Sequence, residues 1–259
     1  MRKTAIFAAA AILVTVTAAP SEARFGFRAR GGFSRIAYSD FNDYVEMTNT
    51  QLSGFAEMDE IRWIPEIGGE FTFAVLPTLT GAVGAGYLTG KSDFGLSLGG
   101  DGLSYSHELR SIPLTATAYW EPPLPFFEPF VFGGVGLYHT RLEFAQRVII
   151  SGSSTGFEAE LTDWGFGLHG GAGIRFAIVP AVGFEIGLSG RWADLSGFEG
   201  TATNLEGDSY DAYLVSDTVE DPQAGSIEYY GPWDSGDDYE EGSVDLTGFT
   251  IFIGVSAGF

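Results

Sequence analysis

Ser106, His107 and Glu108 are the residues whose types come closest to a catalytic set. A hydroxyl, an imidazole and a carboxylate are what serine acyl transfer requires. Neighbouring side chains of an extended strand point to opposite faces, so Ser106 and His107 cannot form a dyad there. His139 is followed by Thr140 and Arg141, so a His-x-Ser arrangement is missing, and no His or Cys spacing suits a metal. We therefore expect no catalytic site, no cofactor and no enzyme.

Isolated charges of both signs recur on the strand face that otherwise carries small residues. They suggest a second kind of site, a set of ion pairs. A hairpin centred on Pro180 would place Arg175 opposite Glu185, as an ion pair between neighbouring strands, and His169 opposite Arg191. Buried charges of this kind require partners. We predict a packed ionic network with interior water; the alternative is a gate whose pairs exchange partners to open a narrow conduit. The predicted members are Arg28, Arg30, Glu66, Glu70, His169, Arg175, Glu185 and Arg191.

The acidic connection 196–243 contains no Lys, Arg or His. A solvated surface excursion explains such a segment, and its tyrosines could also contact a partner. Carboxylates near its end could gather the oxygen ligands that calcium prefers, but their spacing does not match a twelve-residue calcium loop. We predict no metal site; the candidate ligands are Asp234, Asp237, Asp238, Glu240 and Glu241.

The elements that would position these charges are strands, because the apolar pattern has period two along most of the chain. Phe184, Ile186 and Leu188 share one face, and Gly183, Glu185 and Gly187 occupy the other. The pattern predicts eight strands, over about 25–38, 64–76, 78–90, 106–120, 129–144, 162–178, 182–195 and 245–259.

The predicted connections alternate in length. Short links lie near 77, 121–128 and 180, whereas long polar links occupy 39–63, 91–105, 145–161 and 196–244. Short turns at one end and long loops at the other are typical of up-and-down barrels that span a membrane. We therefore predict an all-β fold, an eight-stranded antiparallel transmembrane barrel with short periplasmic turns and long extracellular loops.

The charge balance excludes a nucleic-acid partner. The chain has 259 residues, with 13 Lys and Arg against 34 Asp and Glu, a formal charge of −21. Binding to phosphate backbones needs clustered basic residues. The absence of cysteine also excludes disulfides and thiol chemistry.

Residues 1–23 form a separate unit with the pattern of a secretory signal peptide. Arg2 and Lys3 are followed by an apolar run, and small residues precede Arg24. We predict cleavage after Ala23 and assign residues 24–259 to the barrel, with 196–243 as its long acidic extracellular loop.

The last predicted strand alternates apolar and small residues and ends on the aromatic Phe259, with Gly254 five residues earlier. In this last strand and in the segment Pro129–Gly136, the chain resembles the small eight-stranded outer-membrane barrels of the OmpA-like, opacity-protein and OmpW-like type. The periplasmic domain that larger relatives carry after the barrel is not expected here. The resemblance implies an outer-membrane location and recognition of the last strand, through Gly254 and Phe259, by the assembly machinery. It also implies lipid as the partner and a monomer.

A soluble β-sandwich is the structural alternative, and the glycines argue against it. Glycine on a solvated face weakens a strand, whereas inside a narrow barrel it makes room for long neighbours. Candidate interfacial aromatics at the long-loop end are Trp63, Trp164 and Trp192.

The predicted function is that of an integral outer-membrane protein of a diderm bacterium, non-enzymatic, with a structural or surface-interaction role. One alternative is a narrow conduit or binding protein for small or hydrophobic solutes, as in OmpW-like barrels. A second is a lipid-modifying enzyme at the outer rim, for which His107 would be the residue to test.

Overall fold

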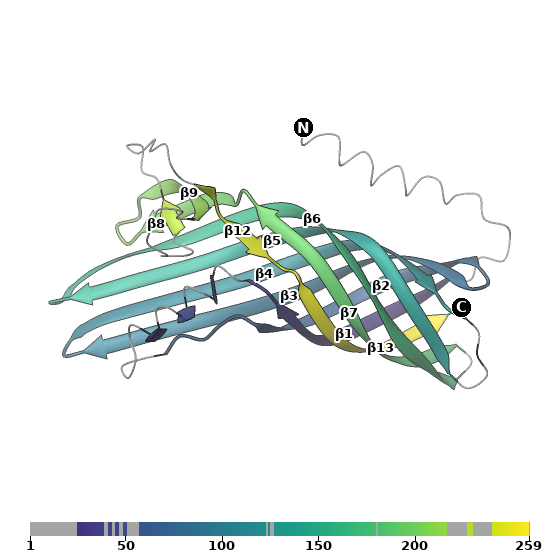
Figure 1. The fold of residues 1–259 in the computed structure, drawn as a ribbon. Helices are drawn as coiled ribbons and strands as arrows, with labels where there is room; N and C mark the ends of the chain where they lie inside the picture. The colour runs from purple at the N-terminus through teal and green to yellow at the C-terminus, as the bar shows by residue number, and fades with distance from the viewer. Residues whose placement is uncertain are drawn as a thin grey trace.

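The structure is a computed structural model that describes residues 25–38, 41–42, 45–46, 49–50, 57–122, 124, 127–179, 181–216, 227–229 and 240–258. Antiparallel strands make up most of this part of the chain (Figure 1). The long strands are β1 (Phe25–Ile36), β2 (Trp63–Leu76), β3 (Leu79–Leu98), β4 (Asp101–Trp120), β5 (Glu128–Ile150), β6 (Ser153–Val179), β7 (Val182–Ser196) and β13 (Gly248–Gly258). The short strands are β8 (Glu199–Asn204), β9 (Ser209–Ser216), β10 (Ile227–Tyr229), β11 (Glu240–Glu241) and β12 (Ser243–Asp245).

The eight long strands pair in a closed ring. Strands β1 to β7 follow one another around the barrel, β13 pairs with β7, and β1 pairs with β13 to close it. The predicted eight-stranded antiparallel barrel is confirmed. The register of the β6–β7 hairpin is also confirmed, because Arg175 lies opposite Glu185 and His169 opposite Arg191.

The outside of the ring is apolar and uncovered by protein. Phe184, Ile186 and Leu188 alternate with inward residues along β7 and are 37%, 45% and 57% exposed. Similar side chains project from all eight strands and form a continuous apolar exterior. Exposure of such a surface to water is unfavourable, and the hydrocarbon of a bilayer would cover it. Among the described residues, no helix is long and apolar enough to cross a bilayer.

Two of the predicted long loops are strands instead. Strands β3 and β4 continue to a two-residue turn at Gly99 and Gly100, and β5 and β6 continue to a similar turn at Ser151 and Gly152. All four turn residues have positive φ, the conformation that tight hairpin turns require. The expected loops 91–105 and 145–161 are therefore hairpins that project beyond the ring, in the direction away from both ends of the described chain (Figure 1). We call this the hairpin end, and the opposite end the turn end.

Most of the described part of the acidic connection 196–243 is also structured. Strands β8 and β9 form a hairpin that pairs with the projecting part of β6, and β12 pairs with the end of β7. These additions extend the sheet at the hairpin end (Figure 1). The predicted signal peptide, residues 1–23, lies outside the described residues.

A hydrophobic core of inward residues from the ring strands and from this extension covers the mouth of the ring at the hairpin end. We call it the apolar cap. Leu109, Leu142, Leu161 and Leu246 are 0% exposed, although they lie beyond the membrane-facing belt of the ring. The cap comprises Ile36, Tyr38, Phe41, Val45, Met58, Ile61, Ile64, Leu88, Phe94, Leu109, Tyr138, Leu142, Phe144, Ala159, Leu161, Ala193, Leu195, Phe198, Ala202, Ala212, Leu214, Val244 and Leu246.

Candidate functional site

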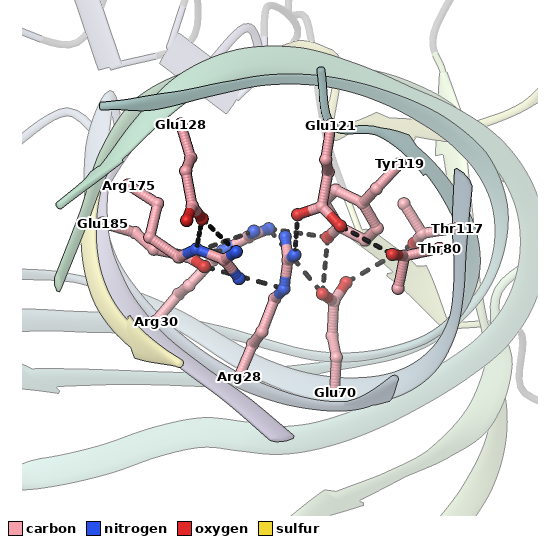
Figure 2. Close-up of polar contacts among 10 residues, drawn as sticks. All are labelled: Arg28, Arg30, Glu70, Thr80, Thr117, Tyr119, Glu121, Glu128, Arg175 and Glu185. Atoms are coloured by element: carbon pink, nitrogen blue, oxygen red, sulfur yellow. Dashed lines mark hydrogen bonds and ion pairs between the residues drawn. The ribbon is translucent and has the colours of Figure 1, made fainter. Parts of the chain in front are cut away.

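The interior of the ring contains the predicted charge network, centred on Glu185 of β7. Its side chain is fully buried and accepts two hydrogen bonds from Arg30 on β1, at 3.2 and 3.0 Å. Arg28 Nε lies 3.6 Å from the same carboxylate (Figure 2). Alternation along β1 directs both arginines inward, so one buried carboxylate faces two guanidinium groups.

A tyrosine that we did not predict joins this network to β2. The Arg30 guanidinium donates to the Tyr119 hydroxyl at 2.8 Å, and Tyr119 donates in turn to Glu70. Arg30 also forms an ion pair with Glu70 at 3.7 Å (Figure 2). Arg28 stacks over the Tyr119 ring, 4.1 Å from its centroid, which adds a cation–π contact. Alternation along β4 places Tyr119 on the inward face, and this pattern could have predicted its place in the network.

Two further carboxylates, again not predicted, complete the network at the turn end. Glu121 pairs with Arg28 and accepts a hydrogen bond from Thr80 at 2.6 Å. Glu128 pairs with Arg175 (Figure 2). Both glutamates flank the proline-rich link between β4 and β5. Because the alternation of the strands stops at that link, the sequence pattern did not show that these side chains point inward.

The predicted Arg175–Glu185 ion pair is wrong, although the register behind it is right. Arg175 lies between Glu185 on β7 and Glu128 on β5, and its side chain pairs with Glu128. The two arginines of β1 already occupy the Glu185 carboxylate from across the ring. Gly183 makes room for the bent arginine, since a Cβ there would lie 2.7 Å from Arg175 Cγ.

A second polar cluster lies nearer the hairpin end. Arg191 forms an ion pair with Glu66 at 3.2 Å and donates to the Leu246 carbonyl at 3.0 Å. Thr250 donates to Glu66 at 3.1 Å, and Ser34 donates to the same carboxylate. These contacts attach the apolar cap to the polar interior, because Leu246 belongs to the cap.

A cavity of about 110 Å³ separates the two clusters. Arg30, Glu70, Arg191 and His169 contribute to its lining. Space of this size holds several water molecules. His169 lies opposite Arg191 in the register, and its Nε2 forms a hydrogen bond with the Thr117 hydroxyl at 2.9 Å.

All eight predicted network residues therefore face the ring interior, together with Tyr119, Glu121 and Glu128. Each described arginine of the interior contacts at least one carboxylate. Burial of unpaired charges costs several kcal/mol each, and these partners offset part of that cost. The arrangement holds the strands together across the ring and fills its turn-end half.

The histidine proposed as a test of catalysis is buried in the apolar cap. His107 is 0% exposed, and its Nε2 forms a hydrogen bond with the Tyr38 hydroxyl at 2.7 Å. It packs against the rings of Phe41 and Phe144, with centroids 4.4 and 4.2 Å away. Burial lowers the pKa of His107 to about 3, so the imidazole is neutral at ordinary pH.

The remaining catalytic candidates are separated from His107. Ser106 points to the opposite face and donates to Asp93 at 2.8 Å, as alternation predicts. Glu108 accepts a hydrogen bond from Arg110 at 2.7 Å. His139 stacks on Trp164, 4.6 Å between centroids, on the outer face.

The metal and assembly candidates fall mostly outside the described residues. Asp234, Asp237, Asp238 and Phe259 lie there, and for Glu240 and Glu241 the structure describes only the backbone of β11. Within the described part of the chain, no group of three or more His, Asp or Glu side chains could hold a metal ion. Gly254 lies on β13 opposite Arg30 of β1. A Cβ at Gly254 would lie 2.6 Å from the Ala29 carbonyl oxygen, so the glycine permits the two strands to close the ring.

No family model matches the chain, and no curated protein sequence matches it. Among solved structures, a major outer membrane protein from Thermus thermophilus aligns with 92% of this chain and 100% of its own, at 15% identity and a TM-score of 0.47. Neisserial surface protein A aligns over the same shares, at 14% identity and a TM-score of 0.40. OprG from Pseudomonas aeruginosa covers 92% of this chain and 94% of its own, at 14% identity and a TM-score of 0.37.

The assignment of this chain rests on its own strand ring and exterior. Eight tilted antiparallel strands close without a free edge, the outward residues are apolar, and the inward residues are polar or small. The chain is an eight-stranded outer-membrane β-barrel, with ion pairs in its interior and an apolar cap at its hairpin end.

Proposed function

We propose that this protein is a closed, non-enzymatic barrel of the outer membrane that presents its hairpin end at the cell surface. Its role is structural or one of surface contact. The observation that carries the proposal is the apolar cap over the mouth of the ring. Leu142, Leu161 and Leu246 are fully buried there, which is the packing of a folded domain rather than of a channel lining.

Two barriers in series support the closed state. From the turn end, a solute would first meet the pairs of Arg28 and Arg30 with Glu185, and then the small cavity. Beyond the cavity, it would meet the pair of Arg191 with Glu66 and the apolar cap. Opening an aqueous path would require these ion pairs to separate and would also expose a hydrophobic core to water, which costs about 25 cal/mol for each Å² of apolar surface.

The positions of the histidines support a non-enzymatic role. An outer-rim acyl-transfer site needs an imidazole that substrate can reach beside a serine. His107 has no exposed surface, and Ser106 lies on the other face of β4. The described rim thus offers no serine–histidine pair to a lipid substrate.

Planar-bilayer recordings on purified, refolded protein test the closed state. We expect no steady conductance from the wild-type protein or from the Glu185→Gln variant. Steady wild-type conductance that changes when Glu185 is neutralised would reject the closed barrel and favour the gate. Cleavage of the connection 196–243 by added protease on intact cells would place the hairpin end outside.

A break in the wall favours a second candidate function, binding or passage of small hydrophobic solutes. Pairing of β3 with β4 is interrupted between Ala85↔Leu114 and Leu88↔Ser111, where Pro113 has no N–H to donate. The outward residues Ile67 and Ala85 line the interior cavity beside this break. A solute could enter sideways from the membrane at this position.

A reversible disulfide crosslink between β3 and β4 tests this lateral path through the barrel wall. A Cβ at Gly86 would lie 3.0 Å from Pro113 Cγ, and the natural chain has no cysteine. The double variant Gly86→Cys, Pro113→Cys would therefore form a single disulfide across the break. If the path operates, oxidation abolishes uptake of a fluorescent apolar dye by proteoliposomes and reduction restores it. Uptake that is absent, or equal in both states, rejects the path.

We also propose that the barrel is a monomer surrounded by lipid and that the assembly machinery recognises β13. The position of Gly254 at the closing seam supports a role for that strand in assembly.

A further inference from the structure

The outward face of β1 ends, at the hairpin end, with an arginine between two aromatic side chains. Arg35 lies directly opposite Trp63 on β2 and Phe249 on β13. The two rings meet edge to face, 5.6 Å between centroids, and are 54% and 41% exposed. The next outward residues toward the turn end, Phe33 and Ile251, belong to the apolar exterior. Arg35 therefore marks the rim of the membrane-facing belt, where lipid headgroups lie.

No described residue of the protein neutralises the charge of Arg35. Among the described residues, its guanidinium has no ion pair and no side-chain hydrogen bond, although acidic residues outnumber basic ones 34 to 13. Three basic residues above the belt on β3, β4 and β5 are paired instead. Their ion pairs are Lys91–Asp93 at 2.9 Å, Arg110–Glu108 at 2.7 Å and Arg141–Glu160 at 2.7 Å.

A cleft of about 390 Å³ opens beside Arg35 on the outer surface. Arg62 contributes a second guanidinium to its lining and pairs with Glu60. Asn42 also lines the cleft, but its amide group is engaged by backbone atoms of Ala37 and Ile61. Among the described residues that line this cleft, Arg35 is thus the free charge, and we call the cleft the Arg35 notch.

Building on the cell-surface placement of the hairpin end proposed above, we propose that the Arg35 notch binds the phosphate group of an outer-leaflet glycolipid of the lipid A type. A guanidinium donates two parallel N–H groups to phosphate oxygens, the strongest pairing open to Arg35. Trp63 and Phe249 contact the same lipid where its headgroup meets its acyl chains. The lipid is favoured over a soluble anion because a net charge of −21 repels soluble anions, whereas acyl chains on the apolar exterior hold a lipid phosphate at this height.

Native mass spectrometry of the full chain in detergent tests the proposal. The protein is titrated with bisphosphorylated lipid A and, separately, with the same lipid A after removal of both phosphates. We expect the wild-type protein to prefer the phosphorylated lipid and the Arg35→Gln variant to bind it about tenfold more weakly, the loss expected for a charge-assisted hydrogen bond. Binding of the dephosphorylated lipid should be equal in both proteins.

Arg147→Gln is the matched control. Arg147 is exposed, has no ion pair among the described residues, and lies on β5 six residues beyond Arg141, about 20 Å farther from the belt. Its replacement removes the same charge and should leave lipid A binding unchanged. Equal loss in the Arg35→Gln and Arg147→Gln variants, or no preference for phosphorylated lipid, would overturn the proposal. Displacement of lipid A by an equal concentration of inorganic phosphate would also overturn it, in favour of a soluble-anion site.

Failure of the notch is separable from failure of the membrane assignment. Gel mobility of boiled and unboiled samples reports the closed barrel, and fractionation of cells reports its location. A variant that stays heat-modifiable and in the outer membrane but keeps its lipid A binding rejects the notch alone. A wild-type chain that is recovered without detergent rejects both.

Discussion

Glu185 illustrates, for a single residue, how this barrel tolerates charge in its interior. The carboxylate is completely buried and is held by two guanidinium groups from β1. In such a site the partners compensate for desolvation, and the removal of one leaves the others buried and unpaired. The same residues that make the interior polar therefore make its closed arrangement stable.

Replacement of Glu185 by Gln should destabilise the folded barrel by about 3 kcal/mol, because Arg28 and Arg30 lose a buried counter-charge. Urea titration of the refolded protein in vesicles measures the change. Glu128→Gln is the control: the Glu128 side chain is 36% exposed at the turn end, and its pair with Arg175 should contribute less than about 1 kcal/mol. Similar losses from the two variants would contradict the described network.

His107 makes the stability of the apolar cap depend on pH. Its pKa is about 3 in the folded cap, against 6.5 for a solvated histidine, so an opened cap takes up a proton that the closed cap excludes. Stability is thus fully present above pH 6.5 and decreases toward pH 3, by at most ~1.4 kcal/mol per pH unit. Hydrogen exchange of the cap between pH 6.5 and 5, above the range in which most carboxylates titrate, should show this slope. The slope should be absent in the His107→Leu variant; an unchanged slope would assign it to other groups.

For the secondary-structure elements, period-two alternation sufficed to predict the ring. Long strands with apolar residues on one face and glycine or charge on the other leave few alternatives, and the Pro180 hairpin fixed a register. The projecting hairpins were missed because Ser92, Phe94 and Leu96 alternate over too few residues among glycines and serines to separate a strand from a polar loop.

The candidate site could be predicted in membership but not in pairing. Parity along each strand showed which charges point inward, and all eight predicted residues do. Arg175 pairs with Glu128 rather than with Glu185. This choice depends on how far each side chain reaches across the ring, and the alternation of residues along a strand carries no information on that reach. The apolar cap could not be predicted because its residues come from segments far apart in the sequence, such as Phe41, Leu142 and Leu246.

The seam between β1 and β13 provides a test of closure. Gly254→Val should impair closure of the ring, by about 1–3 kcal/mol, because its side chain would collide with the Ala29 carbonyl and Arg30. Gly258→Ala on the same strand is the control, since a Cβ there would meet no atom closer than 3.9 Å. The fraction that migrates as the folded form in unboiled gels measures closure. Equal folded fractions for both variants would argue against a seam that depends on close approach at Gly254.

At the scale of the whole molecule, the chain has two hydrophobic surfaces of opposite kinds. The apolar cap is buried by protein at the hairpin end. Phe184, Ile186 and Leu188 on the ring are instead exposed on the protein surface, where the hydrocarbon of a bilayer would cover them. The polar interior lies between them and cannot serve as a conventional core. This distribution fits a barrel in a bilayer with a folded surface domain, and no soluble arrangement of the same strands satisfies it.

Site-directed labelling tests the lipid-facing exterior most directly, because the chain has no cysteine of its own. A fluorophore attached at Ile186→Cys, on the ring exterior, should be quenched by brominated acyl chains and protected from an aqueous quencher. The same label at Asp208→Cys, exposed between β8 and β9, should show the reverse. If the label at position 186 is quenched from water and not from lipid, the exterior is covered by something other than hydrocarbon and the membrane barrel is wrong.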